Sequence, residues 1–382
     1  MAGQRRAWWL RDLIYLVVFV AVLIGITYLL DYAESFYPAI RYYHRILVMM
    51  GINITLAVSL NIINGHAGQF SLGHAGFMAI GAYFAAFLSV YYLAPYVEKF
   101  PETTTAHWLL QNAMLVLAVV LGGAFAALSG YVVGLPSLRL RGDYLAIVTL
   151  GFGEIVPAVF LNADKLTNGT NGIGGIHKPS LMGFTFTLLN PVPYYIAMVA
   201  ILAVTMVFMY RLLDSRLGRA WMAIREDELA AASSGINTVT TKLLAFALGA
   251  STAGLAGVFT AAKLTIVSPD QFSFAVSFTV LAMVVLGGMG NVWGVAVGAF
   301  VIYTIQSVLL KQLNQFFHTV NLPILKDIDF VQYQFLLYGL ALVAMMLLRP
   351  EGLFPSSRRK RELHEASEEV ADVPPPMEAL SG

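Results

Sequence analysis

The chain has 382 residues, of which 58% are hydrophobic and 12% charged, with a formal net charge of +1 and a mean hydropathy of +0.72. Soluble domains carry roughly 25% charged residues, so this composition excludes a soluble protein. It predicts an all-α polytopic membrane protein whose surroundings are the lipid bilayer, and nothing in it indicates a nucleic-acid partner. The lack of cysteine excludes disulfides, thiolate metal sites and cysteine nucleophiles.

Apolar runs long enough to cross a bilayer, about 20 residues each, recur along the chain. The first follows Arg5, Arg6 and Arg11 and has no small-residue cleavage site after it, so it predicts a retained span. The runs predict about ten transmembrane helices, over residues 13–30, 46–63, 70–93, 108–133, 144–161, 193–212, 242–262, 274–290, 292–310 and 333–348.

The distribution of basic residues predicts that both termini are cytoplasmic. With the N-terminus inside, the cytoplasmic segments hold most of the 23 Lys and Arg residues, as the positive-inside rule requires. This orientation gives a cytoplasmic N-terminus at 1–12, a transmembrane domain at 13–348 with a cytoplasmic segment at 213–242, and a cytoplasmic tail at 349–382. The tail is charged and Pro-rich with little to bury, so we expect disorder there.

Two Gly-rich segments interrupt the apolar runs. Residues 64–76 read NGHAGQFSLGHAG, and residues 287–291 read GGMGN. Polar and glycine residues at membrane depth are typical of discontinuous helices that line a cavity, where free N–H groups attract a carboxylate. The alternative for 64–76 is a tight, hydrated turn between two ordinary helices. The candidate substrate-path residues in these segments are His66, Gln69, Ser71, Gly73, His74, Gly287, Gly288 and Asn291.

Glu154 is the one acidic residue predicted to lie well inside a span, in TLGFGEIVPAVFL. An ionisable group at that depth is costly and indicates function, so Glu154 joins the candidate substrate path. The alternative is a glutamate near the outer interface whose carboxylate reaches water.

Residues 213–242, here called the elbow, are rich in charge between two apolar runs. Asp214 or Ser215 predicts a helix start, Gly235 before Ile236 predicts its stop, and Thr238 predicts the cap of the next helix. Trp221, Ile224, Glu228, Ala232 and Gly235 recur at spacings of three and four, which predicts one shared helical face. The elbow is therefore either a solvated surface helix or a docking site.

Small residues also recur at every fourth position, as in Gly122, Ala126, Gly130 and Gly134, and in Gly249, Ala253 and Gly257. Such faces let helices approach closely, so we assign them to packing. The chain has no phosphate-binding G-x-x-x-x-G-K-[ST] motif, no H-E-x-x-H and no G-x-S-x-G, so an enzyme is not expected.

Several stretches together resemble LivM-type permeases, the membrane subunits of bacterial branched-chain amino acid ABC importers. They are residues 68–83 (GQFSLGHAGFMAIGAY), 139–157 (RLRGDYLAIVTLGFGEIVP), 217–236 (LGRAWMAIREDELAAASSGI), 268–291 and 349–353 (RPEGL). The resemblance runs from about residue 46 to 354, and the charged tail after Pro355 departs from it. REDELAAASSG is similar to the EAA loop of importer permeases, with Glu228, Ala231 and Gly235 at signature positions.

The resemblance implies that the elbow docks on a cytoplasmic ATPase, with ATPase-coupling residues Arg225, Glu226, Asp227, Glu228, Ala231 and Gly235. It implies a complex with a paralogous, LivH-like or identical permease, two LivG/LivF-like ATPases and a periplasmic substrate-binding protein, in the bacterial inner membrane. ATP and magnesium would then bind the ATPase, and this chain would hold no cofactor or metal.

The resemblance is compatible with more than one substrate, because related permeases of the superfamily carry urea, short amides or other amino acids. An ion-driven secondary transporter is a further alternative, but it would need intramembrane charge pairs or ion-coordinating carboxylates. Glu154 alone offers little of that kind, and the elbow has no role in such a transporter.

Overall fold

The computed structural model describes residues 41–97, 99–101, 104–137, 140, 143–177, 180–181, 184–185, 192–320, 329–349 and 352–354, with a few single positions between 17 and 32. Most of the predicted first span, both arginines of the 138–142 loop and the tail beyond residue 354 lie outside the described residues.

Helices make up nearly all of the described chain, and short strands occur only in pairs. The α-helices are α2 (Arg41–Asn61), α3 (His74–Phe87), α4 (Ala94–Val97), α5 (Thr105–Ser137), α6 (Asp143–Asn162), α7 (Asp164–Thr167), α8 (Val192–Asp214), α9 (Arg216–Glu226), α10 (Glu228–Ser233), α11 (Thr238–Leu264), α12 (Phe274–Gly287), α13 (Val292–Thr304), α14 (Leu310–Val320) and α15 (Gln334–Leu348). The π-helical turns are η2 (Ile62–His66), η3 (Leu88–Leu93) and η6 (Ile305–Leu309), and the 3-10 turns are η4 (Gly169–Asn171) and η5 (Pro269–Phe272).

Two antiparallel pairs, each of two-residue strands, complete the described secondary structure. Strand β1 (Ile173–Gly174) pairs with β4 (Ile266–Val267), and β2 (Ser180–Leu181) pairs with β3 (Phe184–Thr185). In the first pair Ile173 faces Val267, so the segment after α6 is joined to the segment after α11.

Eight described helices are long and apolar enough to cross a membrane, and Gln334–Leu348 is a shorter apolar helix. Each span predicted beyond residue 40 corresponds to one of these nine. The apolar pair at 274–310, which has almost no loop, is two helices, because Gly288 and Gly290 adopt φ of +107° and +85° between them. The chain is thus an all-α polytopic membrane protein with discontinuous helices.

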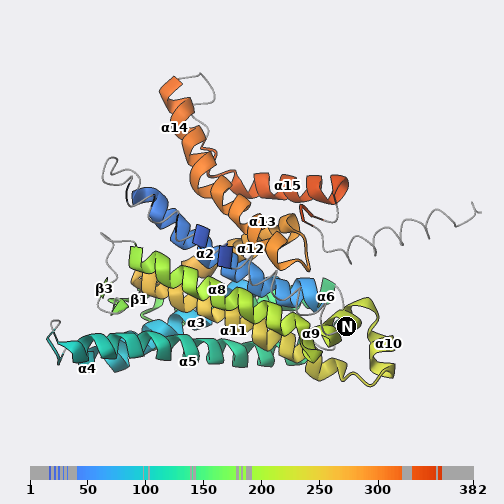
Figure 1. Cartoon of the computed structure of the whole chain (residues 1–382), viewed down its shortest axis with the longest axis horizontal. Helices are drawn as coiled ribbons and strands as arrows, with labels where there is room; N and C mark the ends of the chain where they lie inside the picture. The colour runs from blue at the N-terminus through green and yellow to red at the C-terminus, as the bar shows by residue number, and fades with distance from the viewer. Residues whose placement is uncertain are drawn as a thin grey trace, which may run out of the picture.

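Helix α11 is the centre of the bundle and packs against α5, α3 and α2 (Figure 1). Its small residues face its neighbours, as the four-residue spacing predicts. A Cβ at Gly130 of α5 would lie 2.5 Å from the Cβ of Ala250, and one at Gly254 would lie 2.5 Å from the Cβ of Ala126. Side chains of ordinary size would therefore force α5 and α11 apart, which confirms the packing role predicted for Ala126 and Gly130. On α11 the predicted Gly257 lies against the Met78 carbonyl of α3, and the face toward α5 holds Ala250 and Gly254 instead.

The elbow helices α9 and α10 lie together at one end of the bundle, where α11 begins, whereas α14 projects from the opposite side of the molecule (Figure 1). Helix α9 packs against α8, α11 and η2. The elbow is thus part of the folded bundle, and it lies directly against the first Gly-rich segment.

Candidate functional site

The elbow consists of two short helices instead of one. Asp227 separates α9 from α10 with an extended backbone (φ −152°, ψ 113°), and its Oδ1 accepts hydrogen bonds from the N–H groups of Leu229 (2.8 Å) and Ala230 (3.0 Å). The predicted continuous face from Trp221 to Gly235 is therefore wrong. An aspartate that can cap a new helix N-terminus competes with continuation of the old one, and here the cap forms.

The other helix ends in the elbow lie at or within one residue of the positions that the sequence predicts. Ser215 caps α9 by accepting a hydrogen bond from the Gly218 N–H at 3.3 Å, as predicted. Gly235 has φ +83°, and the Ile236 N–H donates to the Ala231 carbonyl at 3.1 Å, which is the predicted glycine stop. The cap of α11 is Asn237, which binds the Thr240 N–H at 3.1 Å, one residue before the predicted Thr238.

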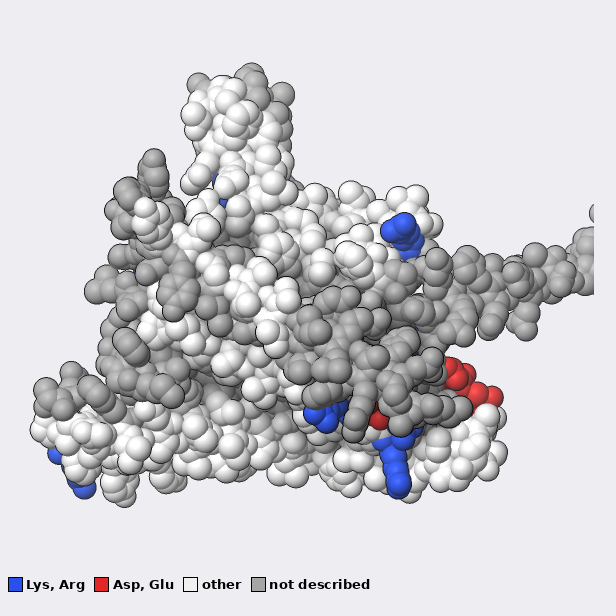
Figure 2. All heavy atoms as spheres, in the orientation of Figure 1, with Lys and Arg blue, Asp and Glu red and all other residues white. Residues whose placement is uncertain are grey.

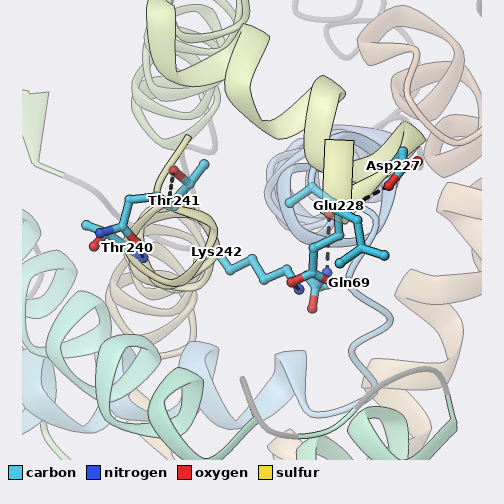
Figure 3. A network of polar contacts seen from close by, with 9 residues as sticks. Gln69, Asp227, Glu228, Thr240, Thr241 and Lys242 are labelled. Atoms are coloured by element: carbon cyan, nitrogen blue, oxygen red, sulfur yellow. Dashed lines mark hydrogen bonds and ion pairs between the residues drawn. The ribbon is translucent and has the colours of Figure 1, made fainter. Parts of the chain in front are cut away.

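Two side-chain contacts hold the elbow against α11. Trp221 is fully buried, and its indole Nε1 donates to the Thr241 carbonyl at 2.7 Å. Lys242 extends from α11 toward Glu228 of α10, and its Nζ lies 2.6 Å from Glu228 Oε1 (Figure 3). Because both helices of the elbow are attached to the same spanning helix, they should move with it as one body.

The predicted coupling residues do not all face outward. Glu226 and Asp227 are exposed, and so is Gly235, whereas Ala231 is only 4% exposed and packs inward. On the view in Figure 2, the acidic side chains and several of the basic ones gather at the end of the molecule where α9 and α10 lie. Leu229 of α10 is an exposed apolar residue among these charges, at 73%.

Arg225 points away from the exposed face of α10. Its Nη1 donates to the Gly65 carbonyl at 2.5 Å, within the first Gly-rich segment. A Cβ at Gly68, whose φ is +67°, would lie 2.9 Å from Arg225 Cγ. The chain at 65–68 thus folds closely around the arginine side chain.

Replacing Trp221 by phenylalanine should loosen the elbow without unfolding the bundle. The ring would still be buried, but the Thr241 carbonyl would lose its donor, at a cost of about 1–3 kcal/mol. Amide hydrogen exchange in residues 228–241 should then become about tenfold faster. Tyr194→Phe is the matched control, because it removes a similar bond, from Tyr194 Oη to the Ala262 carbonyl at 2.9 Å, far from the elbow. Unchanged exchange in 228–241 would contradict the anchoring role of Trp221.

The first Gly-rich segment is a compact, largely buried turn, with Gly68 and Phe70 exposed. Helix α2 widens into the π-helical turn η2, and Asn64 then closes the loop by accepting a hydrogen bond from the Ser71 N–H at 3.1 Å. His66 and His74 are 5% and 0% exposed, and His74 Nε2 lies 2.6 Å from Ser59 Oγ. Ser71 is also fully buried, whereas Gln69 is half-buried.

Gly73 and Gly153 mark a close contact between this segment and α6. A Cβ at Gly153 would lie 2.8 Å from Gly73 Cα, and one at Gly73 would overlap the Thr149 carbonyl. The Thr149 hydroxyl accepts a hydrogen bond from the Leu72 N–H at 3.0 Å. A bulky residue at Gly73 would therefore disturb packing as well as any substrate path.

The second Gly-rich segment meets the first. The Gly290 N–H donates to Asn61 Oδ1 at 2.9 Å, and a Cβ at Gly65 would lie 2.6 Å from the Gly290 nitrogen. Asn291 caps α13 by accepting bonds from Trp293 and Gly294 at 3.1 and 3.2 Å. Gly287 and Gly288 are buried beside it. The two interruptions, which are more than 200 residues apart in sequence, thus form one structure.

Glu154 lies on α6 with its side chain exposed in the single chain. Its Oε1 accepts a hydrogen bond from the Phe274 N–H at 3.0 Å, where α12 begins. The carboxylate therefore accepts a hydrogen bond from one of the N–H groups that have no partner within the helix at a helix start. An exposed carboxylate on an apolar spanning helix should face a polar path or a partner chain, because lipid would not solvate it.

Two apolar cavities lie away from the Gly-rich segments. One of about 340 Å³ is lined by apolar residues of α2, α8 and α13, and one of about 290 Å³ lies between α3 and α6. None of the predicted path residues lines either cavity. Among the described residues, no three His, Cys, Asp or Glu side chains are placed to hold a metal ion.

Three side chains that the sequence did not single out organise this region: Asn61, Thr149 and Ser277. Ser277 Oγ accepts a hydrogen bond from the Ala75 N–H at 2.9 Å, as Thr149 does from Leu72. The sequence signal that could have identified them is a polar side chain inside an apolar run. That signal is weak, because Ser and Thr also bond to their own helix, as Thr252 does.

A bundle of spanning helices with interrupted segments and a structured, charged elbow at one end has the architecture of a membrane permease. The chain belongs to the family described as the branched-chain amino acid transport system / permease component, which matches residues 42–348. No solved structure matches the chain significantly.

Named relatives agree with the family. The chain is 38% identical to the high-affinity branched-chain amino acid transport system permease protein LivM of Salmonella typhimurium, over 83% of this chain and 71% of that protein. It is 28% identical to the probable LivM permease of Methanocaldococcus jannaschii, over 81% and 92% of the two chains. It is also 25% identical to the permease LivH of Salmonella typhimurium, over 65% and 78%.

Proposed function

We propose that this chain is the membrane-spanning subunit of an ATP-driven importer that carries branched-chain amino acids across the bacterial inner membrane. The observation that carries the proposal is the elbow, a pair of capped helices fastened to α11 and to the first Gly-rich segment. A loop that only joined two spans would not need these attachments. The family and the names of the relatives supply the substrate class.

The sequence has no phosphate-binding G-x-x-x-x-G-K-[ST] motif, which supports an energy source on other subunits. We propose two cytoplasmic ATPases that bind ATP and magnesium and dock on the exposed face of α10, with Leu229 at its centre. This chain is then a transport subunit and not an enzyme, and it holds no cofactor of its own. Matches to both LivM and LivH permeases support pairing with a related permease chain. A periplasmic binding protein would deliver the substrate.

Glu154 and the two Gly-rich segments are our candidates for the substrate path. Helix starts can hold the substrate carboxylate, Glu154 can hold its ammonium group, and apolar walls accept the aliphatic side chain. A methylene more or less against such walls changes binding by only about 1–3 kcal/mol. We therefore expect this subunit to accept Leu, Ile and Val alike, with discrimination mainly in the binding protein.

Deletion of the gene, with the rest of the system intact, should reduce uptake of labelled leucine to the background and leave urea uptake unchanged. Complementation with the unaltered gene should restore leucine uptake, and a protonophore should not abolish it while cellular ATP is maintained. Loss of urea uptake with unchanged leucine uptake would assign the chain to urea instead. Uptake that follows the ion gradient and ignores ATP would indicate a secondary transporter.

A further inference from the structure

The C-terminal end of the α2–η2 helix has an unusual cap. In the π-helical turn, the Ala67 N–H donates to the Ile62 carbonyl at 3.0 Å, and the Gln69 N–H donates to the Ile63 carbonyl at 2.9 Å. The Gly65 carbonyl receives its donor from Arg225 of α9, at 2.5 Å. A guanidinium at a helix C-terminus is favoured both by the hydrogen bond and by the helix dipole.

The Gly65 residue that Arg225 binds also touches the second Gly-rich segment. Gly65 lies against Gly290, and Asn61 Oδ1 accepts a hydrogen bond from the Gly290 N–H at 2.9 Å. Arg225, Gly65, Asn61 and Gly290, here called the polar node, therefore connect the elbow to both interruptions of the spanning helices. Each member touches the next, and together they bridge α9, η2 and the turn between α12 and α13.

The node is also held from the elbow side. Trp221 lies one turn before Arg225 on α9 and is fixed to α11 through the Thr241 carbonyl. A Cβ at Gly68 would lie 2.9 Å from Arg225 Cγ, so the backbone there packs closely against the arginine stem. A displacement of α9 should therefore shift the Gly65 carbonyl, because the hydrogen bond and this close packing join Arg225 to residues 65–68.

We propose that Arg225 is the positioning residue that transmits movement of the elbow to both Gly-rich segments, and that it does so by its bond to the Gly65 carbonyl. The inference rests on the proposed function, since it requires a docked ATPase that moves the elbow. Coupling between distant sites needs contiguous contacts that shift together, and the polar node supplies them over a short distance. Arg225 then acts in transmission, whereas the exposed face of α10 acts in docking.

The test measures leucine transported per ATP hydrolysed by the complete complex in proteoliposomes. Arg225→Met removes the guanidinium but keeps an unbranched stem. The matched control is Arg219→Met on the same helix, because Arg219 is exposed and its side chain bonds the Asp214 carbonyl, at 2.7 Å, outside the polar node. We expect the ratio to fall at least tenfold in Arg225→Met and to stay at the wild-type value in Arg219→Met. The ATPases should co-purify with both variants.

A wild-type ratio in Arg225→Met would overturn the inference. So would loss of ATPase co-purification in Arg225→Met alone, because Arg225 would then belong to the docking surface. Failure of the proposed function looks different, since the wild-type complex would then transport no leucine.

A covalent link offers a second readout that does not depend on the stability of Arg225→Met. The chain has no cysteine, and a Cβ at Gly68 would lie 3.2 Å from Arg225 Cβ. This separation is slightly below the about 3.5–4.5 Å of disulfides, so the double variant Gly68→Cys, Arg225→Cys should be joined by a disulfide after a small shift of the backbone. The single variant Gly68→Cys controls for the strain of a side chain at φ +67°. Oxidation should raise its transport-to-ATP ratio at least fivefold over the reduced form, and Arg225→Cys alone should not respond. Equal ratios in the oxidised and reduced double variant would contradict transmission through this contact.

Discussion

Replacement of Leu229 by aspartate is expected to abolish uptake by the assembled transporter while the permease still inserts and folds. Leu229 is 73% exposed on α10, so the substitution removes little packing within the chain. In the proposed complex, however, it would place a carboxylate in the apolar centre of the interface with the ATPase. An unpaired buried charge costs about 3–5 kcal/mol, which weakens association by more than about a hundredfold.

The measurement is co-purification of the ATPases together with uptake of labelled leucine. Val239→Asp is the control, because Val239 is 51% exposed in the first turn of α11 and lies outside α10. We expect the control to retain both properties. If Leu229→Asp binds the ATPases and transports normally, then α10 is a solvated surface helix, the alternative that the sequence left open.

The second large effect concerns Glu154, which could hold the substrate ammonium group or only bond the start of α12. Two substitutions separate these roles. Glu154→Gln keeps an oxygen that can accept the Phe274 N–H bond but loses the negative charge, whereas Glu154→Leu loses both. If the carboxylate holds the substrate ammonium, Glu154→Gln loses a charged hydrogen bond worth about 1.5–3 kcal/mol, so KM should rise about tenfold to a hundredfold. The amount of assembled complex should not change.

Kinetics of leucine uptake in proteoliposomes, with the binding protein in excess, measure this effect. Normal kinetics in Glu154→Gln together with lost assembly in Glu154→Leu would show that Glu154 serves only the start of α12. In that case the substrate path would have to lie along other residues.

Features that depend on neighbouring residues could be read from the sequence. The spans follow from runs of apolar residues, and the Ser215 cap and the Gly235 stop follow from the conformations that these side chains favour. The faces of small residues on α5 and α11 follow from helical spacing. Each of these signals lies within a few residues of the feature that it produces.

The elbow shows where local signals conflict. The spacing from Trp221 to Gly235 favours one helix, but Asp227 followed by Glu228 also favours a new helix start. Capping of two N–H groups by Asp227 stabilises the break, and the Lys242–Glu228 ion pair holds α10 in its new direction. The ion pair joins residues 14 positions apart across a turn, so helical periodicity does not predict it.

The sequence by itself therefore determined the class of protein, the position of nearly every described span, the ends of the elbow and the places where spanning helices are interrupted. Only the tertiary structure decided that both interruptions meet at Asn61 and Gly290, that Arg225 binds the Gly65 carbonyl, and that Glu154 lies at the start of α12. The physical reason is sequence separation. These bonds join residues 120 to 229 positions apart, and they form because helix packing brings unpaired backbone groups within reach of particular side chains.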